Sequence, residues 1–192
     1  MSREAVVEAA AELADEEGLE ALSLSILASR LGIRTPSLYN HIDGLDGLRR
    51  ALALLGIREL GRRLGRAAIG KTTDEATFAI ARTYREFVKA HPGLYAATVR
   101  SFRLSYPEDP TFQAAEKEVL DTVLAVLASY GLRGDDALHA ARGFRSTVHG
   151  FATLEVAGGF GIPLDLDESF ERLLHTFVAG LRDRKANVNR SV

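Results

Sequence analysis

The apolar residues of this sequence recur at the spacing of an α-helix and almost nowhere at the spacing of a β-strand. Near the C-terminal end they stand at i, i+3, i+4, i+7, i+8 and i+11, and they are Phe170, Leu173, Leu174, Phe177, Val178 and Leu181. That spacing places them on one stripe of an amphipathic helix. Two further stripes include Ile80 and Phe112, whereas runs that alternate with period two are scarce. The sequence therefore predicts an all-α protein of about eight or nine helices.

Helix start and stop signals support this division of the chain. Asp109-Pro110 offers an N-cap followed by proline before the Phe112 stripe, and Gly131 can end that helix in a left-handed conformation. A glycine-rich break, 158–163, follows a helix expected to run from about Asp136 to Val156. Asp165 then stands at cap spacing before the last helix.

Composition excludes several function classes. The chain has 192 residues and no cysteine, so disulfides, thiolate zinc sites and cysteine nucleophiles are excluded, and a reducing, cytoplasmic location is expected. No apolar run is long enough for a membrane span. The histidines form no His-x-x-x-His pair, and no Gly-x-Ser-x-Gly elbow or nucleotide-binding loop is present. We expect no catalytic residue, no metal, no cofactor and no membrane partner.

The first fifty residues predict a helix-turn-helix. An apolar face that includes Val6 and Leu13 ends at Gly18, and Ser23 can cap a second short helix that ends at Gly32. Thr35 is expected to be the N-cap of a third short helix and Pro36 its N1 residue, with the helix continuing from Ser37 to Ile42. Two helices joined by a short turn that contains glycine can place the second helix in a DNA major groove.

This segment resembles the DNA-binding domain of the tetracycline-repressor (TetR) family. The match covers about the first quarter of the chain without a gap, and it is strongest at Pro36-Ser37-Leu38-Tyr39-Asn40-His41-Ile42. The rest of the chain resembles the family in length and helical layout. His149-Gly150-Phe151 followed by Gly158-Gly159-Phe160 resembles one C-terminal subgroup. The resemblance implies a DNA-binding domain at 1–48, a helical bundle domain for ligand binding and dimerisation at 49–185, and a polar tail at 186–192.

The resemblance also implies roles for individual residues. Groove-facing residues would be Thr35, Pro36, Ser37 and Asn40, while Tyr39 and His41 would bond backbone phosphates. Ser23 or Ser25, together with Arg34, would add contacts at the edges. These roles suit the side chains, because hydroxyl groups bond phosphates or bases and asparagine can pair bidentately with adenine.

Charge is distributed in a way that suits DNA. Residues 1–29 hold one basic and seven acidic side chains, whereas residues 30–66 hold eight arginines and only three acidic residues. Leu45 departs from the family, which usually has a phosphate-binding lysine at this position, and Arg34, Arg49 or Arg50 could compensate. The alternative is that these arginines form an ordinary solvated helix face.

Dimerisation follows from the small reach of one recognition helix, because specific binding normally needs two half-sites. The resemblance implies a four-helix interface, for which the candidates are the segment 136–156 and the last helix. Interface residues are expected to be Phe170, Leu174, Phe177, Val178 and Leu181, although each could equally lie in the core of one chain.

An apolar effector pocket is expected between the helices of the bundle. Its candidate residues are Phe87, Tyr95, Phe102, Tyr106, Phe112, Phe144, His149 and Phe151, with further polar contacts from Arg103 and Glu155. For each aromatic residue the alternative is a plain core position. The resemblance further implies that a helix from about Asp46 to Ala68 links the pocket to the DNA-binding domain.

These features predict a ligand-responsive transcriptional repressor that binds a palindromic operator in double-stranded DNA as a homodimer and is released by a small apolar effector. The alternative is a helical small-molecule-binding or interaction protein with weakened DNA binding, which the loss at Leu45 suggests. An enzyme built on a helical bundle is a more distant third.

Overall fold

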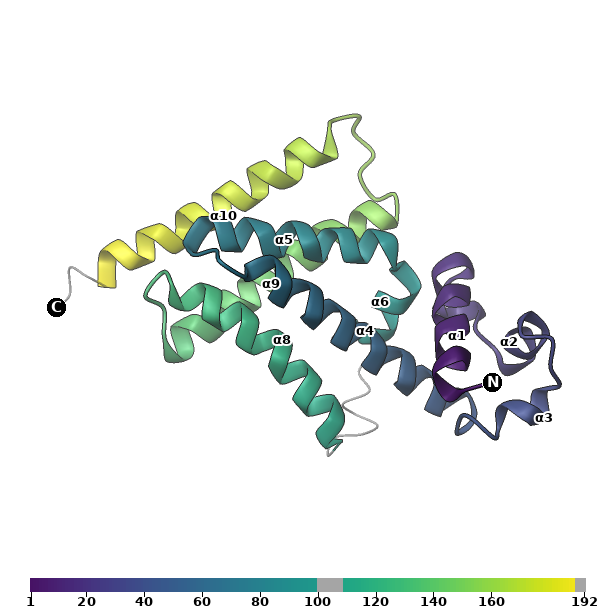
Figure 1. The fold of residues 1–192 in the computed structure, drawn as a ribbon. Coiled ribbons are helices and arrows are strands. Elements are labelled where there is room, and N and C mark those ends of the chain that lie inside the picture. Colours follow the sequence, from purple (N-terminus) through teal and green to yellow (C-terminus); the bar gives the residue numbers. More distant parts are fainter. Residues whose placement is uncertain (100–108, 189–192) are drawn as a thin grey trace. The chain divides into compact units, whose positions relative to one another are not determined.

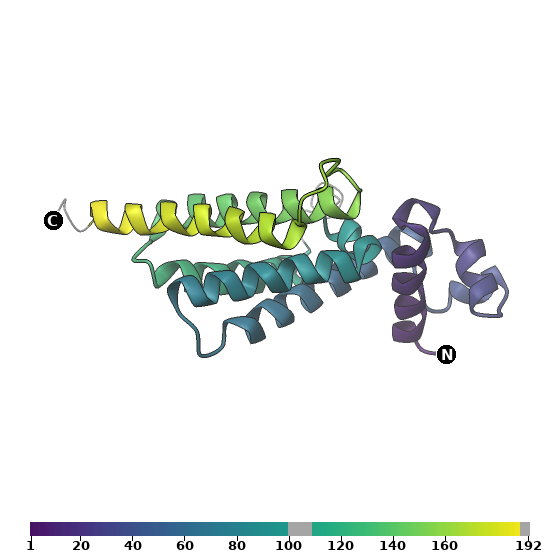
Figure 2. The ribbon, with the colours of Figure 1, turned by 90° about the horizontal axis from the view of Figure 1, so that it is seen from above.

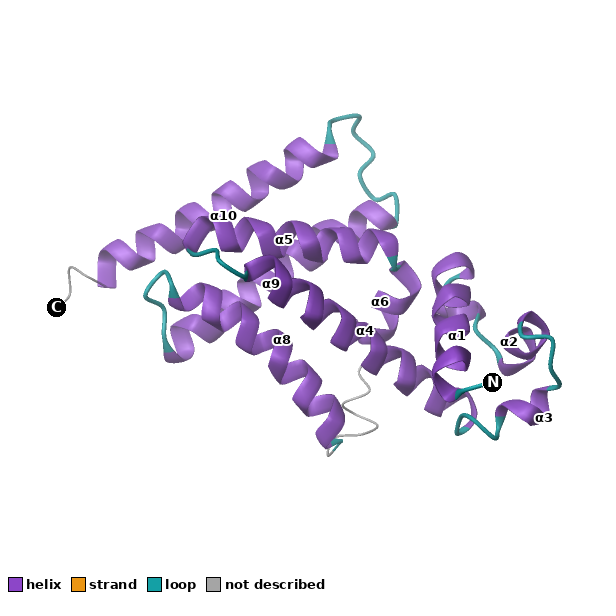
Figure 3. Ribbon diagram, in the orientation of Figure 1, coloured by secondary structure: helices purple, strands orange, loops and turns teal. Residues whose placement is uncertain are grey.

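The computed structural model describes residues 1–99 and 109–188, and every regular element within those ranges is a helix (Figure 3). The predicted all-α class is therefore confirmed. In chain order (Figure 1) the elements are α1 (Arg3–Glu17), η1 (Leu19–Ala21), α2 (Leu24–Arg30), α3 (Thr35–Leu38), α4 (Gly44–Ala68), α5 (Thr73–Ala90), α6 (Pro92–Val99), α8 (Pro110–Ala128), α9 (Gly134–Val156) and α10 (Leu166–Val188). Within the described ranges, no helix is long and apolar enough to cross a membrane.

Two compact units share the chain. The first comprises Met1–Glu59 and Ala90–Glu116, and the second comprises Leu60–Lys89 and Lys117–Val192. Neither unit is continuous in sequence, and the divisions fall inside α4, before the last residue of α5, and inside α8. The domain boundary expected at residue 48 stays a prediction.

The first unit is discontinuous because α6 packs against α1. Gly93 lies so close to α1 that a Cβ atom built on it would stand 1.9 Å from the carbonyl oxygen of Ala14. Asp15, at the next position of α1, accepts a hydrogen bond from the backbone N–H of Leu94 at 2.8 Å. The same carboxylate lies 2.9 Å from Nδ1 of His91. Contacts between residues almost eighty positions apart therefore hold this unit together.

The second unit is a bundle in which α5, α9 and α10 lie side by side (Figures 1 and 2). Its apolar core includes the fully buried Phe87, Phe144 and Phe170. A polar contact joins α5 to the end of α8, where the hydroxyl groups of Thr77 and Tyr130 lie 3.0 Å apart. Burial raises the pKa of Tyr130, and the Thr77 hydrogen bond partly opposes this.

The local signals of the sequence are mostly confirmed. Asp109 accepts hydrogen bonds from the backbone N–H groups of the first turn of α8, and Asp165 accepts one from the backbone N–H of Glu168 at 2.9 Å. Gly18 and Gly32 have positive φ angles of 89° and 67°, as chain reversals at helix ends require.

Candidate nucleic-acid interface

The α2–α3 pair has the geometry that a helix-turn-helix requires. Ser23 caps α2 by accepting a hydrogen bond from the backbone N–H of Ile26 at 3.3 Å. Gly32 reverses the chain, and the backbone N–H of Ile33 then returns to the carbonyl of Ala28 at 3.0 Å. Leu27, Ala28, Leu38 and Ile42 fill the angle between the helices and are all at least 96% buried.

The third helix begins one residue earlier than predicted. Its N-cap is Arg34 rather than Thr35, because the Arg34 carbonyl accepts the first helical hydrogen bond, from the N–H of Ser37 at 2.8 Å. Pro36 therefore stands second in the helix, not first. The α-helix is short, Thr35–Leu38, but the N–H groups of His41 and Ile42 both bond the Leu38 carbonyl and extend the turn.

The predicted DNA-binding residues surround the buried side chain of Leu38. Ser25, Arg34, Pro36, Tyr39 and Asn40 are exposed, and Thr35, Ser37 and His41 are half-buried. Tyr39 leaves 61% of its surface in solvent, which is unusual for a large aromatic side chain. In the described ranges, the side chains of Arg34, Tyr39, Asn40 and His41 bond no other residue. Their polar groups are therefore available to an external partner.

The arginines of residues 30–66 are not all available in the same way. Arg30 donates two hydrogen bonds to the carboxylate of Glu16 on α1, at 2.6 and 2.8 Å, and these bonds lower the pKa of Glu16. Nε of Arg50 donates to Asp109 at 2.6 Å. Arg34, at the start of α3, is exposed and has no such partner in the described structure. Two of the arginines that make this segment basic are therefore paired with carboxylates inside the first unit.

The carboxylate of Asp109 both caps α8 and accepts a hydrogen bond from Arg50. Burial alone would raise the pKa of its carboxyl, but the hydrogen bonds from Arg50 and from two backbone N–H groups outweigh burial and lower it. Leu45, which stands in place of the family's usual lysine, lies half-buried near the start of α4 and offers no positive charge.

Comparison with known proteins identifies both parts of the chain. Residues 6–52 match the family of bacterial regulatory proteins called tetR, and residues 77–177 match the tetracyclin repressor-like C-terminal domain. The uncharacterised HTH-type transcriptional regulator Rv0681 of Mycobacterium tuberculosis is 39% identical over 184 residues, which cover 96% of this chain and 83% of that protein. The uncharacterised HTH-type regulator YobS of Bacillus subtilis is 32% identical, with 98% of this chain and 96% of YobS covered.

The chain belongs to the TetR family. A protein of unknown function from Rhodococcus sp. RHA1 shares the fold, with a TM-score of 0.78, 26% identity, and coverage of 94% of this chain and 95% of that one. The matches to both parts of the chain confirm the family that the sequence resembles. Members of the TetR family are DNA-binding transcriptional regulators and not enzymes.

The residues predicted to line an effector pocket in this TetR-family protein are distributed over both units. Tyr95 and Phe112 are buried in the first unit, and Phe87, Phe144 and Phe151 are buried in the second. Phe102, Tyr106 and Arg103 lie outside the described residues. His149 is half-buried, and burial, together with the charge of Arg145, lowers its pKa. The pocket role of these residues stays a prediction.

The residues predicted for the dimer interface lie mainly in the core of the second unit. Phe170, Leu174, Val178 and Leu181 are at least 96% buried within one chain, so they have little surface left for a second copy. Phe177 is half-buried, with its ring 6.1 Å from that of Phe144. Exposed apolar side chains on α9 include Leu138 and Leu154, at 45% and 49% exposure.

The sequence analysis missed the role of Arg85, a buried cation on α5. It binds Glu155, which was expected to offer a polar contact to an effector. The available signal was a charged residue directly beside the apolar stripe of Ile80, Tyr84 and Val88.

In the described ranges, no three acidic or histidine side chains gather in a group that could hold a metal ion.

Proposed function

We propose that this TetR-family regulator is a repressor that binds a palindromic operator as a homodimer and leaves it when a small apolar effector binds. The observation that carries the DNA-binding part is the exposed, unpartnered face of α3 around Tyr39 and Asn40. The amide of Asn40 and the phenol of Tyr39 are exposed and bond no other residue in the described ranges, so they can exchange hydrogen bonds with water for bonds to base edges and phosphates.

The second copy would pack on the exposed parts of α9 and α10. On these helices the exposed Leu138 and Leu154 and the half-buried Phe177 supply apolar surface. Gly150 and Gly180 leave open space, since a Cβ atom built on either would meet nothing within 4 Å. Small residues of this kind allow a neighbouring helix to approach closely. Two α3 helices would then read two half-sites.

The effector would act through a difference in affinity between two states of the protein. The apolar ligand would bind more tightly to a state whose α3 helices are wrongly spaced for the two half-sites. Operator affinity would then fall by no more than the difference between the ligand's affinities for the two states. The helix α4 is continuous from Gly44 to Ala68 and contributes residues to both units, which supports its proposed role as the link.

Operator binding is the direct test. Footprinting on fragments of the source genome would locate the operator, and fluorescence anisotropy would then give the Kd of each variant. Asn40→Ala should weaken binding by about 1–3 kcal/mol per half-site, because it removes one base-reading amide. Thr72→Ala, which removes an exposed polar side chain of the second unit, is the matched control and should bind like the unmodified chain.

Equal affinity of Asn40→Ala and Thr72→Ala for the footprinted site would contradict the assignment of α3. A panel of apolar compounds added to the complex would test release. Retention of the operator at saturating concentrations of every compound that binds the protein would contradict the effector part alone.

A second candidate function is supported by the arginine pairs. Because Arg30 and Arg50 are occupied inside the first unit and Leu45 carries no charge, the DNA-binding surface has few cations. A helical ligand-binding protein with weakened DNA binding would show this pattern. Absence of any footprint in low salt, with tight binding of an apolar compound, would favour it.

A further inference from the structure

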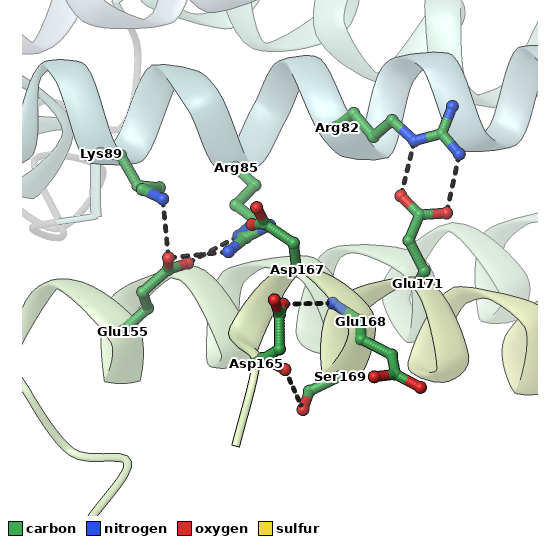
Figure 4. Close-up of polar contacts among 9 residues, drawn as sticks. All are labelled: Arg82, Arg85, Lys89, Glu155, Asp165, Asp167, Glu168, Ser169 and Glu171. Carbon is green, nitrogen blue, oxygen red and sulfur yellow. Dashed lines mark hydrogen bonds and ion pairs between the residues drawn. The ribbon is translucent and has the colours of Figure 1, made fainter. Parts of the chain in front are cut away.

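The buried Arg85 joins three helices of the second unit. From α5, its Nε and Nη2 atoms donate to the two carboxylate oxygens of Glu155 on α9, at 2.6 and 2.7 Å. Its Nη1 atom lies 2.7 Å from the carboxylate of Asp167, in the first turn of α10. Figure 4 shows the guanidinium between these two carboxylates, with Lys89 also 2.7 Å from Glu155.

Two aromatic rings cover the faces of the same guanidinium. The ring centroids of Phe151 and Phe170 lie 5.3 and 4.9 Å from its central carbon. Because rings offer little compensation for lost water, the charge of Arg85 depends on its carboxylate partners. Its hydrogen bond to Glu155 is the main reason that the pKa of Arg85 is raised.

The two carboxylates differ strongly in exposure. The side chain of Glu155 is 9% exposed, and it receives two hydrogen bonds from Arg85 and one contact from Lys89. The side chain of Asp167 is 82% exposed, and within the described residues its one ion pair is with Arg85. Water and salt therefore compete with the Asp167 contact far more effectively than with the Glu155 contact.

The segment between these carboxylates has few other attachments. Residues 157–165 are all exposed, and they include Gly158 at a φ of 67°, two more glycines and Pro163. Phe160 places its ring 4.8 Å from that of Phe151. Beyond Asp167, Arg82 on α5 donates two hydrogen bonds to Glu171, at 2.6 and 2.7 Å, so α10 is fixed again one turn later (Figure 4).

We propose that residues 157–169 form a strap that the Asp167–Arg85 contact latches onto the bundle. The strap opens as a unit between fixed points at Glu155 and Glu171, while the Arg85–Glu155 pair and the bundle stay intact. Opening uncovers the outer edge of the Arg85 guanidinium and the ring of Phe151. This device belongs to the second unit alone and does not depend on DNA binding.

Hydrogen exchange of the strap amides tests the latch. Asp167→Asn should raise the exchange rate of the hydrogen-bonded strap amides, those of Gly158, Gly159, Leu164, Glu168 and Ser169, about two- to fivefold, the size expected when an exposed ion pair loses one charge. High salt should accelerate exchange of the strap in the unmodified chain and change it little in Asp167→Asn. Exchange within α5 and the middle of α9 should stay unchanged in both.

The matched control is Glu168→Gln, which removes the same charge from the same turn but breaks only an exposed contact to Arg172 within α10. Equal exchange rates in Asp167→Asn and Glu168→Gln would overturn the latch. A second variant, Glu155→Gln, should lower the Tm of the protein, whereas Asp167→Asn should leave it nearly unchanged. Equal losses of Tm in these two variants would show one cooperative core without a separate strap.

Discussion

At the scale of single residues, Gly93 shows how one missing side chain allows two distant segments to meet. The first turn of α6 lies directly on the backbone of α1, and the space between them is too small for a methyl group. Gly65, in the last turn of α4, is a contrasting case, because a Cβ atom there would meet nothing within 4 Å.

The two glycines predict opposite effects of the same substitution. Gly93→Ala should destabilise the protein by about 1–3 kcal/mol, because the added carbon forces α6 away from α1. Gly65→Ala should stabilise it by about 0.5–1 kcal/mol, because alanine has a higher helix propensity than glycine and reduces the conformational freedom of the unfolded chain. Urea unfolding followed by circular dichroism would measure both. The close-contact explanation fails if Gly93→Ala is as stable as the unmodified chain.

At the scale of helices, α5 is the element that holds α9 and α10 by charge. The hydrogen bonds from Arg85 are the main cause that lowers the pKa of Glu155 below its ordinary value of 4.5, and those from Arg82 do the same for Glu171. A carboxyl whose pKa is lowered by folding stabilises the native state only while it is ionised.

Acid should therefore weaken the α5–α9 and α5–α10 contacts. The stabilisation from Glu155 and Glu171 is complete above pH 4.5 and is lost as the pH falls through their lowered native pKa values. Tm measured from neutral to acidic pH should fall less steeply in the double variant Glu155→Gln/Glu171→Gln than in the unmodified chain. Parallel acid profiles in the two proteins would contradict the assignment.

At the scale of the whole molecule, the placement of arginines decides how strongly DNA binding can depend on salt. Eight arginines in residues 30–66 suggest a steep dependence. The structure pairs Arg30 with Glu16 and Arg50 with Asp109, whereas Arg34, the N-cap residue of α3, is exposed.

Salt titration of operator binding by the proposed dimer should reflect these pairs. Arg34→Ala should reduce the slope of log K against log salt by about 2, because each of two subunits loses one phosphate contact. Arg58→Ala removes another exposed arginine, which lies on α4 fourteen residues after the helix starts and roughly 21 Å along it, and should leave the slope unchanged. Equal slopes for both variants would place the phosphate contacts elsewhere.

The sequence by itself determined the all-α class, most of the helix caps and the family. Gly18, Ser23, Asp109 and Asp165 act on backbone groups within a few positions, so their effects are visible in a local pattern. The candidate DNA-contacting residues around Leu38 were named from the family resemblance of this segment, and their contact with DNA stays a prediction.

Only the tertiary structure decided which charged side chains form ion pairs and which glycine allows two helices to approach closely. Arg85 meets Glu155 across 70 positions, Arg50 meets Asp109 across 59, and Gly93 meets Ala14 across the whole of α4 and α5. Nothing in the spacing of a sequence encodes such pairs, because a charge or a missing side chain is matched only when the fold brings its partner within a few ångströms.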